Sequence, residues 1–123
     1  MSIVHTSPNL RSNFLSNWLD TRERRKSLSE DSTSGLKVAI WGAGAKGATY
    51  LNLIDPNREL IEFAVDLTSE KQGKFIPGTG HKIVSYEALR NVDVVLLMNP
   101  NYHEENQKLL DDAGIKVLMI DVN

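Results

Sequence analysis

The sequence contains no cysteine and few prolines and aromatic residues. Without thiols the chain can form neither a disulfide nor a thiolate metal site. The three histidines, His5, His81 and His103, are scattered and lack the spacing of a metal-ligand motif. We therefore expect no metal site, and thiol usage gives no information on the redox compartment.

Neither sign of charge dominates the chain. Lys and Arg number 14 against 16 Asp and Glu, a formal net charge of -2, so no basic face indicates a nucleic-acid partner. The longest apolar runs, such as residues 92–98, are far shorter than the roughly 20 residues of a membrane-spanning helix. A secretory leader is not evident at the N-terminus. These features predict a cytoplasmic protein that binds neither nucleic acid nor membrane.

The first third of the chain differs from the rest. Apolar residues at helical spacing between Pro8 and Leu28 predict one amphipathic helix, with Ser7 and Pro8 suited to its cap and first turn. A cationic cluster at 22–26 suits the end of this helix, and a solvated helix end is favoured over a phosphate or lipid patch. A Ser-rich linker follows, so we place a boundary between an N-terminal unit, 1–35, and a globular domain, 36–123.

From Leu36 onward, short apolar runs alternate with helical stretches. Strands that are apolar throughout and interleaved with helices are typical of a parallel sheet covered on both faces. The sequence therefore predicts an α/β fold, a small Rossmann-like three-layer sandwich with a mostly parallel sheet. The expected strands are 37–41, 61–65, 82–84, 92–98 and 116–120, and the expected helices are 45–54, 86–90 and 102–113.

Three glycines follow the first expected strand in the pattern GxGxxG, at Gly42, Gly44 and Gly47. Such a loop between a strand and a helix lets backbone N–H groups reach a phosphate at the helix N-terminus. Asp66 closes the next apolar run, at about the 20-residue distance at which the fingerprint has a ribose-binding acid. The candidate ligand-binding residues are Gly42, Ala43, Gly44, Ala45, Lys46, Gly47 and Asp66.

The loop leaves several interpretations open. NAD is the usual ligand of this pattern, and an acidic Asp66 would repel the 2′-phosphate of NADP. The glycine turn can also serve packing alone, and Lys46 can contact a ligand phosphate or simply be solvated. A self-contained S-adenosylmethionine site is disfavoured, because Ile40 stands where such loops carry an acidic residue.

Two further segments join the candidate site. Residues 71–80 are rich in glycine and form either a functional loop or a simple connection between strands. Asn99 and Asn101 follow the most apolar strand, which we expect beside the first strand, so both are candidate ligand contacts. For Asn101 we favour a helix cap instead. Tyr102 and His103 can contact a sugar or a base, but no general base is assigned and no catalytic residue is identified.

Taken in order, the segments VAIWGAGAKGATYLN, VD at 65–66, KQGKF, PGTGHKIV and DVVLLMNPNY resemble the C-terminal domain of S-adenosylmethionine-dependent C-methyltransferases, which include enzymes that methylate nucleotide-linked deoxysugars. The resemblance covers roughly residues 36–120. A weaker one, through the glycine loop and the KQGK segment, links the chain to nucleotide-sugar-binding N-terminal domains of bacterial sugar acetyltransferases.

The resemblance implies an accessory domain that holds a nucleotide sugar, without the zinc-binding and methyltransferase domains of such enzymes. Catalysis with S-adenosylmethionine would then belong to a partner or missing domain. The N-terminal helix would dock on that catalytic subunit or on a second copy, or cover its own core, which is favoured; its apolar face comprises Leu10, Phe14, Leu15, Trp18 and Leu19. The alternatives are an NAD-binding domain of an oxidoreductase and a domain that binds nothing and serves assembly.

Overall fold

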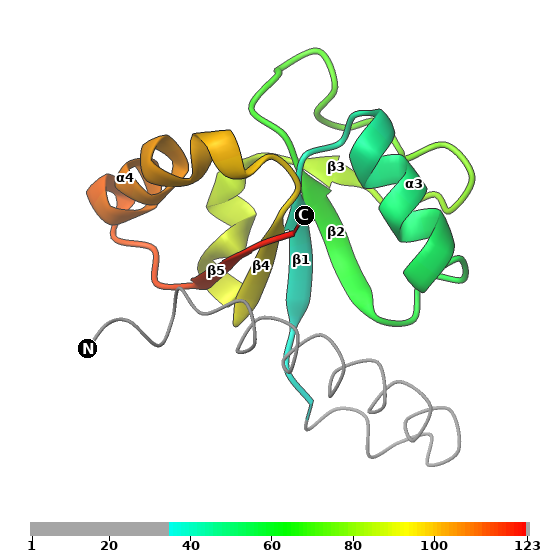
Figure 1. Ribbon diagram of the computed structural model, residues 1–123, viewed down its shortest axis with the longest axis horizontal. Helices are drawn as coiled ribbons and strands as arrows, with labels where there is room; N and C mark the ends of the chain where they lie inside the picture. The colour runs from blue at the N-terminus through cyan, green and yellow to red at the C-terminus, as the bar shows by residue number, and fades with distance from the viewer. Residues whose placement is uncertain (1–34, 123) are drawn as a thin grey trace. The chain divides into compact units, whose positions relative to one another are not determined.

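Five parallel strands form a single sheet in the order β3-β2-β1-β4-β5 (Figure 1). The structure, a computed structural model, describes residues 35–122, so the helix expected between Pro8 and Leu28 lies outside the described residues. The strands are β1 (Val38–Trp41), β2 (Ile61–Val65), β3 (Ile83–Val84), β4 (Val94–Leu97) and β5 (Leu118–Asp121). The helices are α3 (Ala45–Ile54) and α4 (His103–Ala113), with the 3-10 helices η2 (Tyr86–Asn91) and η3 (Pro100–Tyr102).

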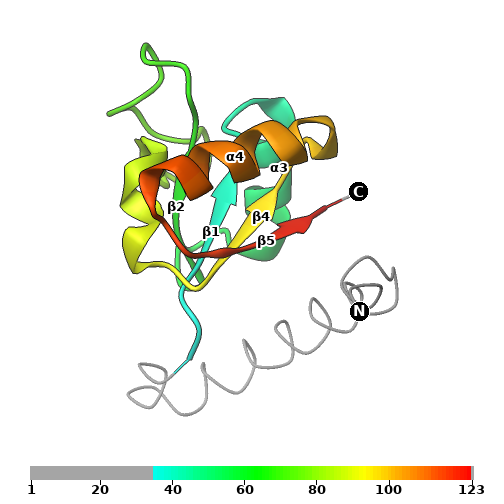
Figure 2. The same cartoon turned by 90° about the vertical axis from the view of Figure 1, so that its left-hand side faces the viewer.

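The two central strands explain the all-apolar runs of the sequence. Every residue of β1 and β4 is buried, because helices cover both faces of the sheet. Helix α3 covers one face, while α4 and η2 cover the other (Figures 1 and 2). On the face of α4, Trp41 and Leu97 share one buried cluster with Leu89 and Leu110. The expected three-layer α/β fold is confirmed, and its sheet is entirely parallel.

Strand order places the ends of β1 and β4 side by side. Trp41 pairs with Leu97, and the Met98 N–H donates to the Trp41 carbonyl at 3.0 Å. The next residues of the two strands therefore emerge together at one edge of the sheet, which we call the carboxyl edge. In open α/β sheets this edge, at the point where the strand order reverses, is where ligands bind.

Two of the expected helices have bounds that differ slightly from the expectation. The helix expected at 86–90 spans residues 86–91 and is a 3-10 helix, capped by the Ser85 hydroxyl, which accepts from the Glu87 N–H at 3.2 Å. Tyr102 belongs to η3, and α4 begins at His103. Within residues 35–122, no helix has the length and apolar character needed to cross a membrane.

Candidate functional site

The glycine loop connects β1 to α3 at the carboxyl edge, and two of its glycines are required by the fold itself. Gly42 has φ 124°, a conformation that side chains disfavour, and a Cβ there would lie 3.0 Å from the Cβ of Met98. A Cβ on Gly47 would lie 1.9 Å from the Gly42 carbonyl oxygen. These two glycines allow the turn and the close approach of α3 to β1, as the sequence pattern predicts.

Gly44 is different, because the fold leaves room for a side chain there. Its φ of -82° is accessible to any residue, and an added Cβ would have only Lys71 Nζ near it, at 4.0 Å. Gly44 is also the N-cap of α3, where no described side chain caps the helix and the first turn carries no acidic residue. The first N–H groups of an α-helix have no intrahelical acceptor, so this helix end is open to an anion.

Asp66 lies directly against the glycine loop. Its Oδ2 accepts from the Ala43 N–H at 3.0 Å, and its Oδ1 accepts from the Thr68 N–H at 2.9 Å. Burial raises the pKa of Asp66, but the hydrogen bonds from Thr68 and Ala43, with the charge of Lys71, lower it overall. The carboxylate therefore stays ionised, and 14% of its side chain remains exposed beside the loop.

Lys71 is a residue of the candidate site that the sequence interpretation did not single out. Its Nζ lies 3.8 Å from Asp66 Oδ2 and faces the space over Gly44. The side chain is 44% exposed, so the ammonium group is accessible to a ligand. Its position inside the KQGK segment was the only signal in the sequence. Lys46, by contrast, points to the other half of the sheet, where its Nζ donates to the Val122 carbonyl at 3.4 Å.

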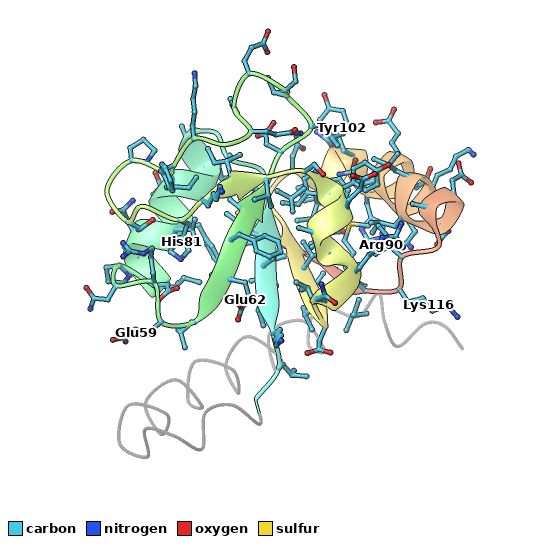
Figure 3. All side chains as sticks on the ribbon, turned by 180° about the vertical axis from the view of Figure 1, so that it is seen from behind. Glu59, Glu62, His81, Arg90, Tyr102 and Lys116 are labelled. Carbon is cyan, nitrogen blue, oxygen red and sulfur yellow. The ribbon has the colours of Figure 1, made fainter. Side chains whose placement is uncertain are left out.

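The segment after β4 reaches the same edge. Asn99 and Asn101 are both exposed there. The expectation that Asn101 caps the following helix is wrong: Asn99 Oδ1 accepts from the Asn101 N–H at 3.2 Å and caps η3, while α4 begins after Tyr102 without a side-chain cap. Tyr102 is 52% exposed and lies at the carboxyl edge in Figure 3.

Two His–Asp pairs occupy very different surroundings. His103 Nδ1 lies 2.7 Å from Asp121 Oδ1 at the carboxyl edge, and both side chains are partly exposed. His81 is almost fully buried beside α3 (Figure 3), with Nε2 3.0 Å from Asp55 Oδ2 and Nδ1 2.6 Å from Thr79 Oγ1. The order Asp, His, Thr resembles a nucleophile relay, but Thr79 is 2% exposed, so no substrate can reach it.

A pocket of about 440 Å³ lies away from the glycine loop. It is lined by residues before β4, by residues before and at the start of β5, and by α4, including Asp93, Asp111 and Lys116. These are the amino ends of the strands, where the backbone does not present a loop and a helix N-terminus together. The candidate site therefore stays at the carboxyl edge.

The fold and the loop define a Rossmann-like α/β domain. Comparison with family models matches residues 11–119 to the C-methyltransferase C-terminal domain, and the chain belongs to this family. The match begins well before residue 36, where the resemblance read from the sequence begins, so the family's domain includes part of the N-terminal segment. No curated protein matches the chain.

Proposed function

We propose that this domain binds a nucleoside diphosphate sugar for a C-methyltransferase, with the diphosphate at the N-terminus of α3. Membership of the C-methyltransferase C-terminal domain family supports the link to methyl transfer. Transfer itself requires a methyl donor and a catalytic methyltransferase domain, supplied by another part of the same polypeptide or by a separate subunit. The role of the present domain is to hold the acceptor.

The space over Gly44 is the observation that carries this proposal. A glycine that neither the turn nor the packing requires leaves a gap between an uncapped helix end and the Lys71 ammonium group. Both features favour an anion: the helix through its free N–H groups and dipole, and the lysine through its charge. A diphosphate in this gap would lie beside Asp66, whose exposed edge would accept a hydrogen bond from a ribose hydroxyl.

Asn99 and Asn101 would complete the site from the β4 side. Their amides are exposed at the same edge, and such groups both donate to phosphate oxygens and accept from hydroxyls. Lys46 would neutralise phosphate charge from the first turn of α3 if its long contact with Val122 were exchanged for the ligand.

Calorimetric titration of the full chain tests this function with UDP-glucose, dTDP-glucose and NAD. We expect Gly44→Val to weaken nucleotide-sugar binding at least tenfold, because the new side chain fills the gap while the backbone conformation is retained. Thr49→Val, an exposed site on the same helix, is the matched control. Lys71→Ala should weaken binding several-fold, and the neighbouring exposed Lys74→Ala should not.

The alternative functions give different results. An NAD-binding oxidoreductase domain is favoured by the position of Asp66, and would bind NAD but none of the nucleotide sugars. A domain that serves assembly alone would bind none of these ligands. The wild type and Gly44→Val would then both show no binding in the titration. Either result would replace the proposed function.

A further inference from the structure

The His103–Asp121 pair presents one imidazole nitrogen for a ligand. A carboxylate only accepts hydrogen bonds, so at 2.7 Å the proton of a neutral imidazole lies on Nδ1. The other nitrogen, Nε2, then carries a lone pair and has no hydrogen-bond partner among residues 35–122. The His103 side chain is 36% exposed.

The pair lies at the same edge of the sheet as the glycine loop, although it is distant from the loop in sequence. Asp121 is the register partner of Leu97, which pairs with Trp41, so all three residues lie level at the ends of their strands. Lys46 in the first turn of α3 reaches Val122, the residue after Asp121. Along this edge, Asp66 and Lys71 lie on the β2 side of the glycine loop, and the His–Asp pair lies on the β5 side.

We propose that His103, oriented by Asp121, binds the sugar half of the nucleoside diphosphate sugar, its Nε2 accepting a hydrogen bond from a sugar hydroxyl. The inference rests on the proposed function. With the diphosphate at α3 and the ribose beside Asp66, the second phosphate directs its sugar towards β4 and β5. A sugar offers hydroxyl donors, which require an acceptor held in place, and the carboxylate fixes both ring orientation and tautomer. Asp121 is thus a positioning residue.

The test separates the sugar from the rest of the ligand. Calorimetry on the full chain compares UDP-glucose, UDP-galactose and dTDP-glucose with UDP and dTDP. We expect His103→Ala to weaken the best-bound nucleotide sugar about five- to tenfold, the effect of one hydrogen bond, and to change the affinity for the bare diphosphates less than twofold. Partly exposed pairs contribute little stability, so the variant should fold. Lys108→Ala, which breaks the exposed pair with Asp112, is the control.

The role of Asp121 has its own readout. Asp121→Asn retains an acceptor for Nδ1–H and should keep most of the affinity for the nucleotide sugar, whereas Asp121→Ala should lose as much as His103→Ala. Nitrogen-15 NMR of the imidazole should show the proton on Nδ1 in the wild type and a shift towards Nε2 in Asp121→Ala. A purely structural pair would not produce this coupled change.

The outcomes distinguish this inference from the proposed function. If neither nucleotide sugars nor bare diphosphates bind the wild type, the proposed function fails and the inference fails with it. Two other results would overturn only the present inference, provided that binding depends on Gly44 and Lys71. In the first, His103→Ala weakens nucleotide sugars and bare diphosphates equally. In the second, His103→Ala weakens the binding of neither.

Discussion

Asp55 is a buried carboxylate that ties three segments of the chain together. Its two oxygens accept from the N–H groups of Glu59, Leu60 and Ile61 at 2.7, 3.0 and 2.8 Å, and from His81 Nε2 at 3.0 Å. Burial raises the pKa of Asp55, but these hydrogen bonds outweigh burial and the pKa is lowered overall. The end of α3, the start of β2 and the approach to β3 therefore depend on one ionised side chain.

Asp55→Ala should lower the free energy of unfolding by about 3 kcal/mol or more, because it leaves several buried donors without an acceptor. Urea denaturation monitored by circular dichroism measures this change. Lys108→Ala at the exposed pair on α4 should change stability by less than about 0.5 kcal/mol. Similar losses in the two variants would contradict the role assigned to Asp55.

The lowered pKa of Asp55 also predicts acid sensitivity. The folded-state pKa lies below the ordinary aspartate value of 3.8, so the unfolded chain takes up the proton first as the pH falls. The stabilisation by Asp55 is thus complete above pH 3.8 and is lost as the pH falls through the folded-state pKa. Denaturation series between pH 6 and pH 2.5 should show a steeper acid loss of stability in the wild type than in Asp55→Asn. Equal slopes would assign the acid response to other carboxylates, such as Asp66.

Residue pairs of this kind could not be predicted from the sequence. Asp55 and His81 are 26 positions apart, and His103 and Asp121 are 18 apart, with no motif that links them. Lys71 contacts Asp66 only because the segment after β2 turns back towards the glycine loop. The glycines and Asp66 were found because strand, turn and helix follow one another locally, whereas these pairs depend on tertiary folding.

At the scale of elements, the expected bounds of α3 and β2 agree with the structure. Helix α3 begins at the glycine loop and ends just before Pro56, and both are signals that the sequence shows directly. Strand β4 is shorter than its apolar run of 92–98. Val92 and Met98 are buried although they lie outside the strand. The expected strand was therefore too long, because it was predicted from hydrophobicity alone. The helix expected at 86–90 is present as the 3-10 helix η2; a segment of six residues has too little periodicity to predict the helix type.

The contact between α3 and β1 predicts effects of different size at two glycines of one loop. Gly47→Ala should destabilise the protein by about 2 kcal/mol or more, because a methyl group 1.9 Å from the Gly42 carbonyl oxygen forces α3 away from the strand. Gly44→Ala should change the free energy of unfolding by less than about 0.5 kcal/mol. Alanine lowers the conformational entropy of the unfolded chain, which stabilises the protein, but it is a poorer N-cap than glycine, which destabilises it by a similar amount. Thermal and urea denaturation of both variants measure the difference. Equal destabilisation would show that Gly44 also serves packing.

At the scale of the whole molecule, the carboxyl edge gathers polar groups from three separate connections. The loop after β1 supplies the open helix end, the segment after β2 supplies Asp66 and Lys71, and the segment after β4 supplies Asn99 and His103. Each of these groups lies within residues 42–103, apart from the Asp121 partner of His103. All of the groups proposed for the site therefore lie among the described residues.

That location predicts what removal of the N-terminal segment should do. A fragment of residues 36–123 should bind the nucleotide sugar within about threefold of the full chain, because every proposed contact is retained. A fragment of residues 11–123, which keeps the full extent of the family match, is the matched control. Calorimetry measures binding, and thermal unfolding monitored by circular dichroism establishes whether each fragment unfolds cooperatively. Loss of cooperative unfolding only in the shorter fragment would contradict the boundary at residue 35 and assign residues 11–35 to the folded unit. Cooperative unfolding without binding would instead show that the N-terminal segment contributes to the ligand site.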